Sequence, residues 1–312
     1  MSGRSIPWLG LIALALLSVA AVGVVSLPAV QQQALLRALR SLLVWLPALY
    51  GLVALSYAGR YWRWRLLLGR LGIGRTDWSD LLGWFRGFAL TATPAKVGEL
   101  SRVQLLHEQL GYPRLPLVHV FVAERCADVA AVALLLLVLP PAQVLGRLPS
   151  ATAPLLLGLV LVALAGVLLV SRPAPRRWFK RKWQHWRHHL PSGALARATV
   201  PATLISVLVW ANEALVLWLL VRLLAPTPIT IPAAIAIYLL SGTAGMASSL
   251  PGGIGVNEGA TVLLLAQQGV PAAVALPIAV LRRLITLWSM VALAAAVGVL
   301  PLSPQGQLRR DS

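Results

Sequence analysis

Five carboxylates in this sequence fall inside or against apolar runs, where charged side chains are rare. They are Glu99, Glu124, Asp128, Glu213 and Glu258, out of nine acidic residues in a chain of 312. Three arginines, Arg125, Arg282 and Arg283, have equally apolar surroundings. A charge at the centre of a bilayer costs at least a few kcal/mol, unless it is paired or hydrated. The set therefore predicts ion pairs between helices or a polar pathway for a charged molecule.

The spacing of these residues indicates which of them can meet. Glu124 and Asp128 stand four residues apart, so they share one face of a helix. Arg125 points about 100° away from that face, and we expect it to reach Glu99 or a phosphate. For Glu124 and Asp128, the alternative is a structural bond between neighbouring helices.

The second group of charges has no acidic residue close to its arginines in the sequence. Arg282 and Arg283 are adjacent, and Glu258 or Glu213 is their expected partner. A structural ion pair with Glu258 is the alternative to a binding role.

Two Pro/Gly motifs interrupt the apolar runs beside these charges. Ser249–Glu258 reads S-L-P-G-G-I-G-V-N-E, and Thr93–Arg102 reads T-P-A-K-V-G-E-L-S-R. Proline ends a helix and glycine accepts most backbone angles, so each motif breaks a helix. At membrane depth such a break is tolerated only where protein or a water-filled cavity surrounds it. The candidate site therefore also includes Pro94, Lys96, Gly98, Arg102, Pro251, Gly252, Gly253, Gly255 and Asn257.

The two breaks predict a site for an anion. Gly98 and Gly255 are expected to start half-helices, whose N-terminal N–H groups attract negative charge. Lys96 and Arg102 add positive charge, and a phosphate suits bidentate arginine. Two structural alternatives apply: Asn257 as a helix cap, and the Pro-Gly pair as a simple kink.

The composition is that of an all-α polytopic membrane protein forming a single domain over 1–312. Hydrophobic residues make up 58% and charged residues 12%, whereas soluble domains are about a quarter charged. The single cysteine, Cys126, excludes an internal disulfide and a multi-cysteine metal site. We expect no metal and no cofactor.

The net charge of +18 is better explained by membrane topology than by nucleic-acid binding. The basic residues cluster in short loops beside apolar runs, which is the positive-inside pattern. Arg60–Arg75 and the loop 171–199 are expected to be cytoplasmic, which places both termini in the cytoplasm. Trp62 and Trp64 are expected at headgroup level beside the first loop. The three histidines of the second loop lack acidic or cysteine companions, so a surface helix on anionic headgroups is expected there.

Hydropathy predicts six full spans and two hairpins. The spans are Ile6–Val30, Leu42–Ala58, Leu115–Leu139, Ala153–Val170, Val200–Leu224 and Pro271–Leu300, with Gln31–Arg40 as a polar link. One hairpin consists of Asp80–Thr93 and Gly98–Leu110, and the other of Ile229–Ser248 and Gly255–Val270. A 14-residue arm reaches roughly 21 Å against about 30 Å of hydrocarbon, so both hairpins are expected to be re-entrant.

The two halves of the chain follow the same plan. Pro94 precedes Arg125 by 31 residues, and Pro251 precedes Arg282 by 31. The first half starts inside and the second outside, so about 1–140 and 153–301 are expected to form an inverted repeat. Transporters with such repeats bind their substrate near the midplane, where broken helices meet.

Four motifs together resemble a known family: P-A-K-V-G-E-L-S-R, V-A-E-R-C-A-D, L-P-G-G-I-G-V-N-E-G and L-R-R-L-I-T. They are similar to the flippase-like membrane region of lysylphosphatidylglycerol synthases, over nearly the whole chain. The resemblance implies lipid translocation. Members that aminoacylate phosphatidylglycerol carry a large C-terminal soluble domain; this sequence ends at Ser312, and we expect no synthase activity.

The resemblance also implies which residues matter. The matching positions are Pro94, Gly98, Glu99, Arg102, Glu124, Arg125, Asp128, Gly252, Gly253, Gly255, Glu258 and Arg283.

The leading hypothesis is a flippase-like transporter in a bacterial inner membrane. It would move an anionic phospholipid, an aminoacylated one or a polyprenyl-phosphate-linked sugar between leaflets. One alternative is an intramembrane headgroup or glycosyl transferase, in which Glu124 and Asp128 serve as base or metal ligands. Another is an accessory subunit of a separate lipid-modifying enzyme. The expected partners are the lipid, a second copy of the chain or that enzyme, and no nucleic acid.

Overall fold

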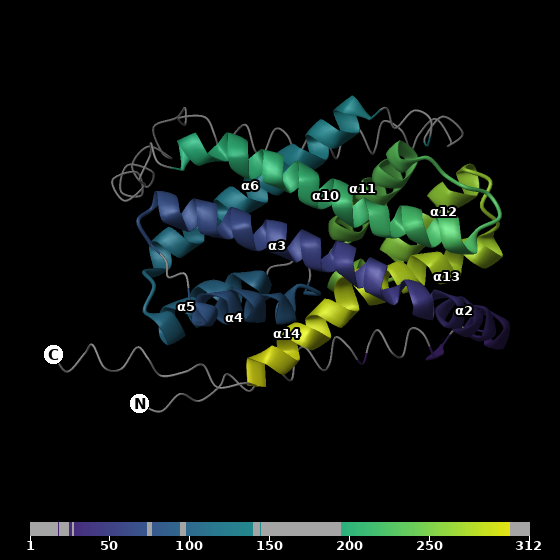
Figure 1. Cartoon of the computed structure of the whole chain (residues 1–312), viewed down its shortest axis with the longest axis horizontal. Helices are drawn as coiled ribbons and strands as arrows, with labels where there is room; N and C mark the ends of the chain where they lie inside the picture. Colours follow the sequence, from purple (N-terminus) through teal and green to yellow (C-terminus); the bar gives the residue numbers. More distant parts are fainter. Residues whose placement is uncertain are drawn as a thin grey trace.

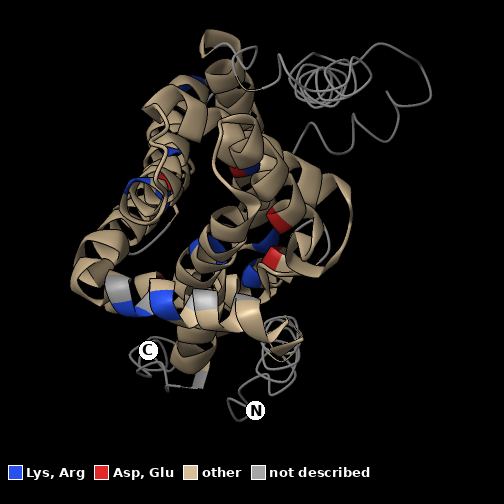
Figure 2. Cartoon of the chain, turned by 90° about the vertical axis from the view of Figure 1, so that its right-hand side faces the viewer, with Lys and Arg blue, Asp and Glu red and all other residues tan. Residues whose placement is uncertain are grey.

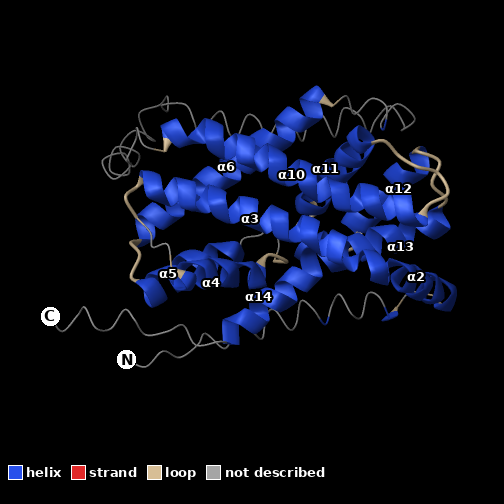
Figure 3. Ribbon diagram, viewed as in Figure 1, coloured by secondary structure: helices blue, strands red, loops and turns tan. Residues whose placement is uncertain are grey.

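The computed structural model describes residues 28–73, 77–93, 98–139 and 195–299, together with residues 18, 25, 26 and 144. Within these residues all regular structure is helical, which confirms the all-α part of the prediction (Figure 3). Three of the described helices are long and apolar enough to cross a membrane: Leu43–Arg70, Arg197–Leu224 and Ala272–Gly298. The predicted span 153–170, almost all of 6–30 and most of the basic loop 171–199 lie outside the described residues.

Three long helices pack together. They are α3 (Leu46–Arg70), α6 (Arg114–Val138) and α10 (Ala196–Leu224). Two of them, α3 and α10, run side by side along the long axis of the molecule, and the third, α6, crosses behind them obliquely (Figure 1). A 3₁₀ turn, Leu43–Trp45, joins α3 to the preceding helix. These helices form the frame against which the two hairpins pack.

The first hairpin is formed by α4 (Trp78–Arg86), the 3₁₀ turn Gly87–Leu90 and α5 (Ser101–Leu110). The Asp77 carboxylate caps α4 by accepting the backbone N–H of Asp80 at 3.0 Å. The two arms of this hairpin, α4 and α5, pack against each other, so the predicted hairpin is present.

The second hairpin is formed by α11 (Ile231–Ala247), the 3₁₀ turn Pro251–Gly253 and α12 (Val256–Gln267). Gly253 has φ +67°, and a methyl group there would lie 2.8 Å from the Cα of Gly245. Only glycine fits this close approach of two backbones. Figure 1 shows α4 and α5 at the left-hand end of the molecule and α11 and α12 towards the right-hand end.

The last helix changes its hydrogen-bonding pattern part-way. Regular α13 (Ala272–Arg283) passes through a π-helical segment, Leu284–Trp288, into α14 (Ser289–Val299). The predicted span 271–300 is therefore one helical run with a π interruption directly after its two arginines. α13 packs on α10 and α12, whereas α14 packs on α4 and the Gly87–Leu90 turn.

Two hydrophobic cores share the long helices. The first is built from α11, α12 and α13, with Leu49 of α3 and Leu217 of α10 among its fully buried members. The second is built around the first hairpin and α14, with Trp64 of α3 and Ala202 of α10. Both helices contribute to both cores, and Tyr57 of α3 packs against both.

Two predictions about the N-terminal part are wrong. The residues Gln31–Arg40, expected as a link, form part of α2 (Ala29–Leu42), which packs against α13. The helix predicted to end at Ala58 continues to Arg70, so four of the five arginines expected in a loop lie on α3. Arginine is a good helix former, and three of the four have acidic partners.

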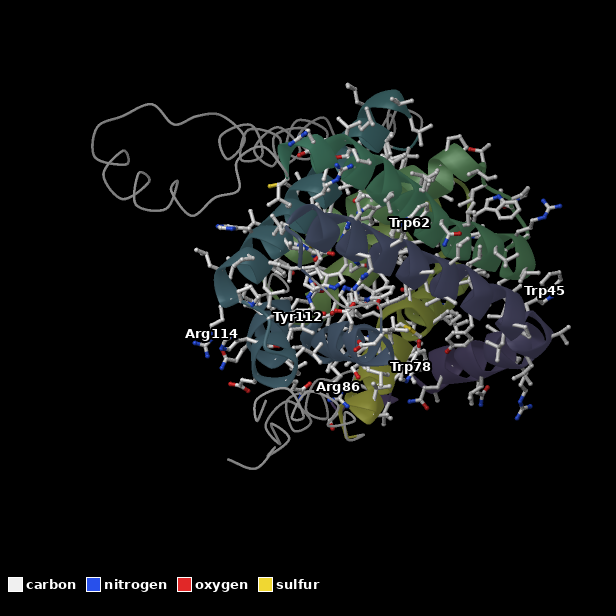
Figure 4. All side chains as sticks on the ribbon, turned by 60° about the vertical axis from the view of Figure 1, so that its left-hand side comes forward. Trp45, Trp62, Trp78, Arg86, Tyr112 and Arg114 are labelled. Atoms are coloured by element: carbon white, nitrogen blue, oxygen red, sulfur yellow. The ribbon has the colours of Figure 1, made fainter. Side chains whose placement is uncertain are left out.

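The tryptophans of α3 include one that is exposed and one that is buried. Trp62 is 68% exposed and lies on the outer side of the bundle (Figure 4). Trp64 is 1% exposed, because its ring stacks under the guanidinium of Arg102, 4.4 Å from the ring centroid. The expected headgroup position is therefore wrong for Trp64.

Candidate functional site

Charged side chains fill the space between the two cores, at the middle of the long helices. Figure 2 shows acidic and basic residues next to each other inside the bundle. The helix-borne members are Arg60 and Arg63 of α3, Arg102 of α5, Glu124, Arg125 and Asp128 of α6, Glu213 of α10, and Arg282 and Arg283 of α13. We call this set, with Glu99 and Glu258 of the breaks, the charged belt.

Arg63 joins the two carboxylates of α6. It is 1% exposed and donates to Asp128, to the Ser206 hydroxyl and, at 3.5 Å, to Glu124 Oε1. Glu124 also accepts from Arg102. The predicted common face of Glu124 and Asp128 is thus confirmed, while their shared partner was missed.

Arg125 holds the first break. Its guanidinium lies 3.6 Å from Glu99 Oε2 and 3.1 Å from Asp128 Oδ2. Glu99 also accepts from the Thr91 hydroxyl at 2.9 Å. The predicted pairing of Arg125 with Glu99 is confirmed.

Arg283 holds the second break in the same manner. Its Nε donates to Glu258 Oε1 at 3.0 Å, and its Nη2 donates to the carbonyl oxygen of Gly252. The other oxygen of Glu258 accepts the Gly255 N–H at 2.8 Å and so caps α12. The expected pairing with Glu258 is confirmed.

Glu213 pairs with Arg60 instead of the α13 arginines. Arg60 Nη2 lies 2.7 Å from Glu213 Oε1, and the Tyr238 hydroxyl donates to Glu213 Oε2 at 2.7 Å. The expectation that Glu213 could serve Arg282 or Arg283 is therefore wrong, because a nearer cation on α3 occupies it.

Arg282 has neutral partners. Its Nη2 donates to Asn257 Oδ1 and, at 3.1 Å, to Thr261 Oγ1. Its guanidinium lies 5.1 Å from the centroid of the Tyr238 ring. Asn257 is thus a buried partner of Arg282, and Gly255 is the N-cap residue of α12. The helix-cap interpretation of Asn257 is wrong.

One cavity of about 110 Å³ joins the two breaks, with room for several water molecules. From the first break it is lined by Thr91, Thr93 and Glu99, and from the second by Gly252, Gly253 and Asn257. The charged lining residues are Arg60, Glu99, Glu213, Arg282 and Arg283. Three arginines against two glutamates leave this lining positively biased.

The breaks also approach each other directly. A methyl group added at Gly252 would lie 3.5 Å from the Cβ of Ala92. No helix separates the two motifs at this point.

Of the predicted site residues that the structure describes, some line the cavity and the others do not. Glu99, Glu213, Gly252, Gly253, Asn257, Arg282 and Arg283 line the cavity. Gly98, Arg102, Glu124, Arg125, Asp128, Pro251, Gly255 and Glu258 are not among the lining residues, and Pro94 and Lys96 lie outside the described residues.

Two backbone donors differ from expectation. The Gly98 N–H donates to Thr93 Oγ1 at 2.7 Å, and the Gly255 N–H is taken by Glu258. Neither N–H group is available to an anion, because a side chain of the same break accepts each of them.

Sequence reasoning missed Arg60, Arg63 and Tyr238. The missing signal was a charge balance: five acidic residues in apolar runs faced only three arginines assigned to the same depth. Arg60 and Arg63, three residues apart on one helix face, supply the remaining cations.

Comparison with protein families agrees with this arrangement. Residues 10–294 match the family described as the lysylphosphatidylglycerol synthase TM region. The chain belongs to this family. The resemblance predicted from the four motifs is thereby confirmed, and membership indicates a membrane protein of lipid modification or translocation. No curated protein shows significant similarity to the chain.

Proposed function

We propose that this member of the lysylphosphatidylglycerol synthase TM family is a flippase-like transporter that moves a lipid headgroup between leaflets. The observation that carries the proposal is a cavity that both broken hairpins line, with five charged side chains in its wall. Because polar groups inside a membrane protein usually mark a substrate or ion pathway, a cavity between two breaks is suited to a headgroup.

The rim of the cavity suits the lipid tails. Met246 and Leu250 line the cavity and are 44% and 46% exposed. An apolar, exposed rim beside a polar interior lets the acyl chains stay in the bilayer while the headgroup enters. The substrate classes that this supports are an anionic or aminoacylated phospholipid and a polyprenyl-phosphate-linked lipid.

The proposal includes the inverted repeat. The two hairpins stand towards opposite ends of the long helices and meet at Ala92 and Gly252 (Figure 1). This supports two halves, about 1–140 and 153–301, that enter a bacterial inner membrane from opposite faces as re-entrant hairpins. Both chain termini are then cytoplasmic.

The transferase alternative has less support from the site. Glu124 and Asp128, its candidate bases, are both bound by Arg63. Two carboxylates that are already occupied by a guanidinium of the chain are not free to meet a substrate, so a positioning role suits them better.

Reconstitution tests the proposal. The purified protein is placed in vesicles containing a fluorescent short-chain phosphatidylglycerol, and a membrane-impermeant quencher reports how fast the outer leaflet is replenished. Mass spectrometry of the same vesicles reports any chemical change of the lipid. We expect rapid replenishment with unaltered lipid.

Matched variants sharpen this experiment. Arg283→Ala removes a cavity arginine and should abolish exchange, whereas Arg222→Ala removes an exposed arginine of α10 and should not. Exchange equal to that of protein-free vesicles contradicts the proposal. Altered lipid then favours the transferase, and unaltered lipid favours the accessory subunit.

A further inference from the structure

We infer that the cavity selects a lipid whose headgroup is a net anion, bound through its phosphate at Arg282, over one that carries an added cationic aminoacyl group. This inference rests on the proposed function and narrows its substrate class. It follows from which charges of the cavity are already neutralised and which one is not.

The structure places almost all acidic residues of the chain, so their ion-pair partners can be identified. Eight of the nine lie within the described residues, and Asp311 is the ninth. At the cavity, Glu213 is paired with Arg60, and Glu99 with Arg125. Both carboxylates that line the cavity therefore have an arginine of their own chain, which leaves no acidic group ready for a substrate cation.

Arg282 is different. It is 2% exposed, lines the cavity, and has no carboxylate within 4.0 Å among the described residues. Its hydrogen bonds go to an amide and a hydroxyl, and its Nε has no acceptor. A buried cation without a counter-charge is costly, so an anion entering the cavity would be stabilised there.

Arg125, the arginine at the matching position of the first half, differs from Arg282 in its partners. Arg125 follows Pro94 by the same 31 residues that separate Arg282 from Pro251. Arg125 has two carboxylate partners, Glu99 and Asp128, whereas Arg282 has none. The related positions thus differ in function: one arginine holds its break in place, and the other is left to bind an anion.

This arrangement discriminates between headgroups. A phosphodiester such as phosphatidylglycerol brings one negative charge, which Arg282 accepts by charge-assisted hydrogen bonds. A lysyl ester of the same lipid adds two ammonium groups. These would have to displace an arginine from Glu213 or Glu99, or lie near Arg282 and be repelled.

The test is ligand-dependent thermal stability of the detergent-purified protein, with phosphatidylglycerol, lysyl-phosphatidylglycerol and inorganic phosphate as separate probes. In the wild type we expect phosphatidylglycerol to raise the melting temperature most. Arg282→Gln should weaken its apparent affinity about tenfold or more, since a hydrogen bond to a charged group contributes that much. Arg282→Lys should keep the order of the lipids, and Arg222→Gln should behave as the wild type.

Each other outcome contradicts the inference. Equal or stronger stabilisation by the lysyl lipid in the wild type refutes the charge selection without any variant. Unchanged phosphatidylglycerol affinity in Arg282→Gln refutes the role of Arg282. If inorganic phosphate stabilises as strongly as the lipid, the site binds free anions and not a headgroup.

The vesicle experiment keeps this separate from the proposed function. Lipid exchange by a wild type that shows no preference for phosphatidylglycerol refutes only the charge selection. Selective binding without exchange refutes only the transport.

Discussion

Arg63 is the residue on which most of the charged belt depends. It is enclosed by Asp128, Glu124 and Ser206, which come from two other helices. Without Arg63, each of the two carboxylates keeps one arginine, Glu124 that of Arg102 and Asp128 that of Arg125. A buried charge that loses part of its pairing is costly. Arg63 should therefore act chiefly on stability, unlike Arg282.

We expect Arg63→Ala to lower the free energy of unfolding by about 3–5 kcal/mol, because two buried carboxylates lose their common partner. Chemical denaturation in detergent, followed by circular dichroism, measures this. Arg222→Ala, which removes an exposed guanidinium stacked on Trp218, should change it by less than about 1 kcal/mol. Equal stability of the two variants would show that Arg102 and Arg125 balance these carboxylates without Arg63.

The ion pairs of the breaks were predictable from sequence, whereas those of α3 were not. Glu99, Arg125, Glu258 and Arg283 stand inside apolar runs, so each needed a partner nearby. Arginines also mark cytoplasmic loops, and a dense run of them satisfies the positive-inside rule equally well. Arg60 was assigned to a loop for this reason.

Among the elements, the second break is set by its glycines. Gly252, Gly253 and Gly255 all have positive φ angles, and the backbone of Gly253 packs against that of Gly245. The turn therefore depends on close backbone contact between α11 and the break as well as on Pro251.

Gly253→Ala should destabilise the protein by at least about 1–2 kcal/mol, because alanine resists a positive φ and its methyl group would meet backbone atoms that cannot move away. Gly259→Ala is the matched control: it lies on α12, and nothing stands within 4 Å of an added methyl group. It should be neutral or stabilising by up to about 1 kcal/mol. Thermal unfolding of the two variants decides the matter, and equal melting temperatures would contradict close packing at Gly253.

The hairpins followed from the sequence because proline, glycine and arm length all indicate the same break. The helix α2 did not, because its glutamines and arginines resemble a polar link when read as composition alone. The π segment Leu284–Trp288 has a mostly apolar sequence, and nothing in its residue types distinguishes it from α-helix. Its Ile285 belongs to the first core and its Trp288 to the second.

For the whole molecule, the meeting of the two breaks is the arrangement most open to test. A Cβ at Gly252 would lie 3.5 Å from that of Ala92, which is within the Cβ–Cβ range of a disulfide, about 3.5–4.5 Å. With Cys126 replaced by alanine, the pair Ala92→Cys and Gly252→Cys should form an intramolecular disulfide on oxidation and stop lipid exchange.

Reduction should restore exchange in that variant, and each single cysteine should remain exchange-competent under oxidising conditions. Free thiols in the double variant after oxidation, measured by mass-tag labelling, would place the two breaks apart.

Topology is the second prediction at this scale. Single cysteines at Arg75 and Arg187 should react with an impermeant reagent only after the membrane is opened, and one at Arg147 should react from outside. The reason is the density of basic residues around 171–199, which favours the cytoplasmic side. Labelling of position 187 in intact cells would reverse the orientation.

The packing of the C-terminal helix has one more consequence, which concerns how the two halves associate. α14 lies in the second half of the chain but packs in the core of the first hairpin, and its buried Val291 and Ala294 belong to that core. Among the residues that the structure describes, both cores draw on both halves of the chain. Two fragments produced from a gene divided between residues 139 and 195 should therefore find each other and assemble, because each supplies apolar surface that the other leaves exposed. The two parts of the chain would then be held together mainly by this exchanged packing, and the peptide link between them would add mainly local concentration.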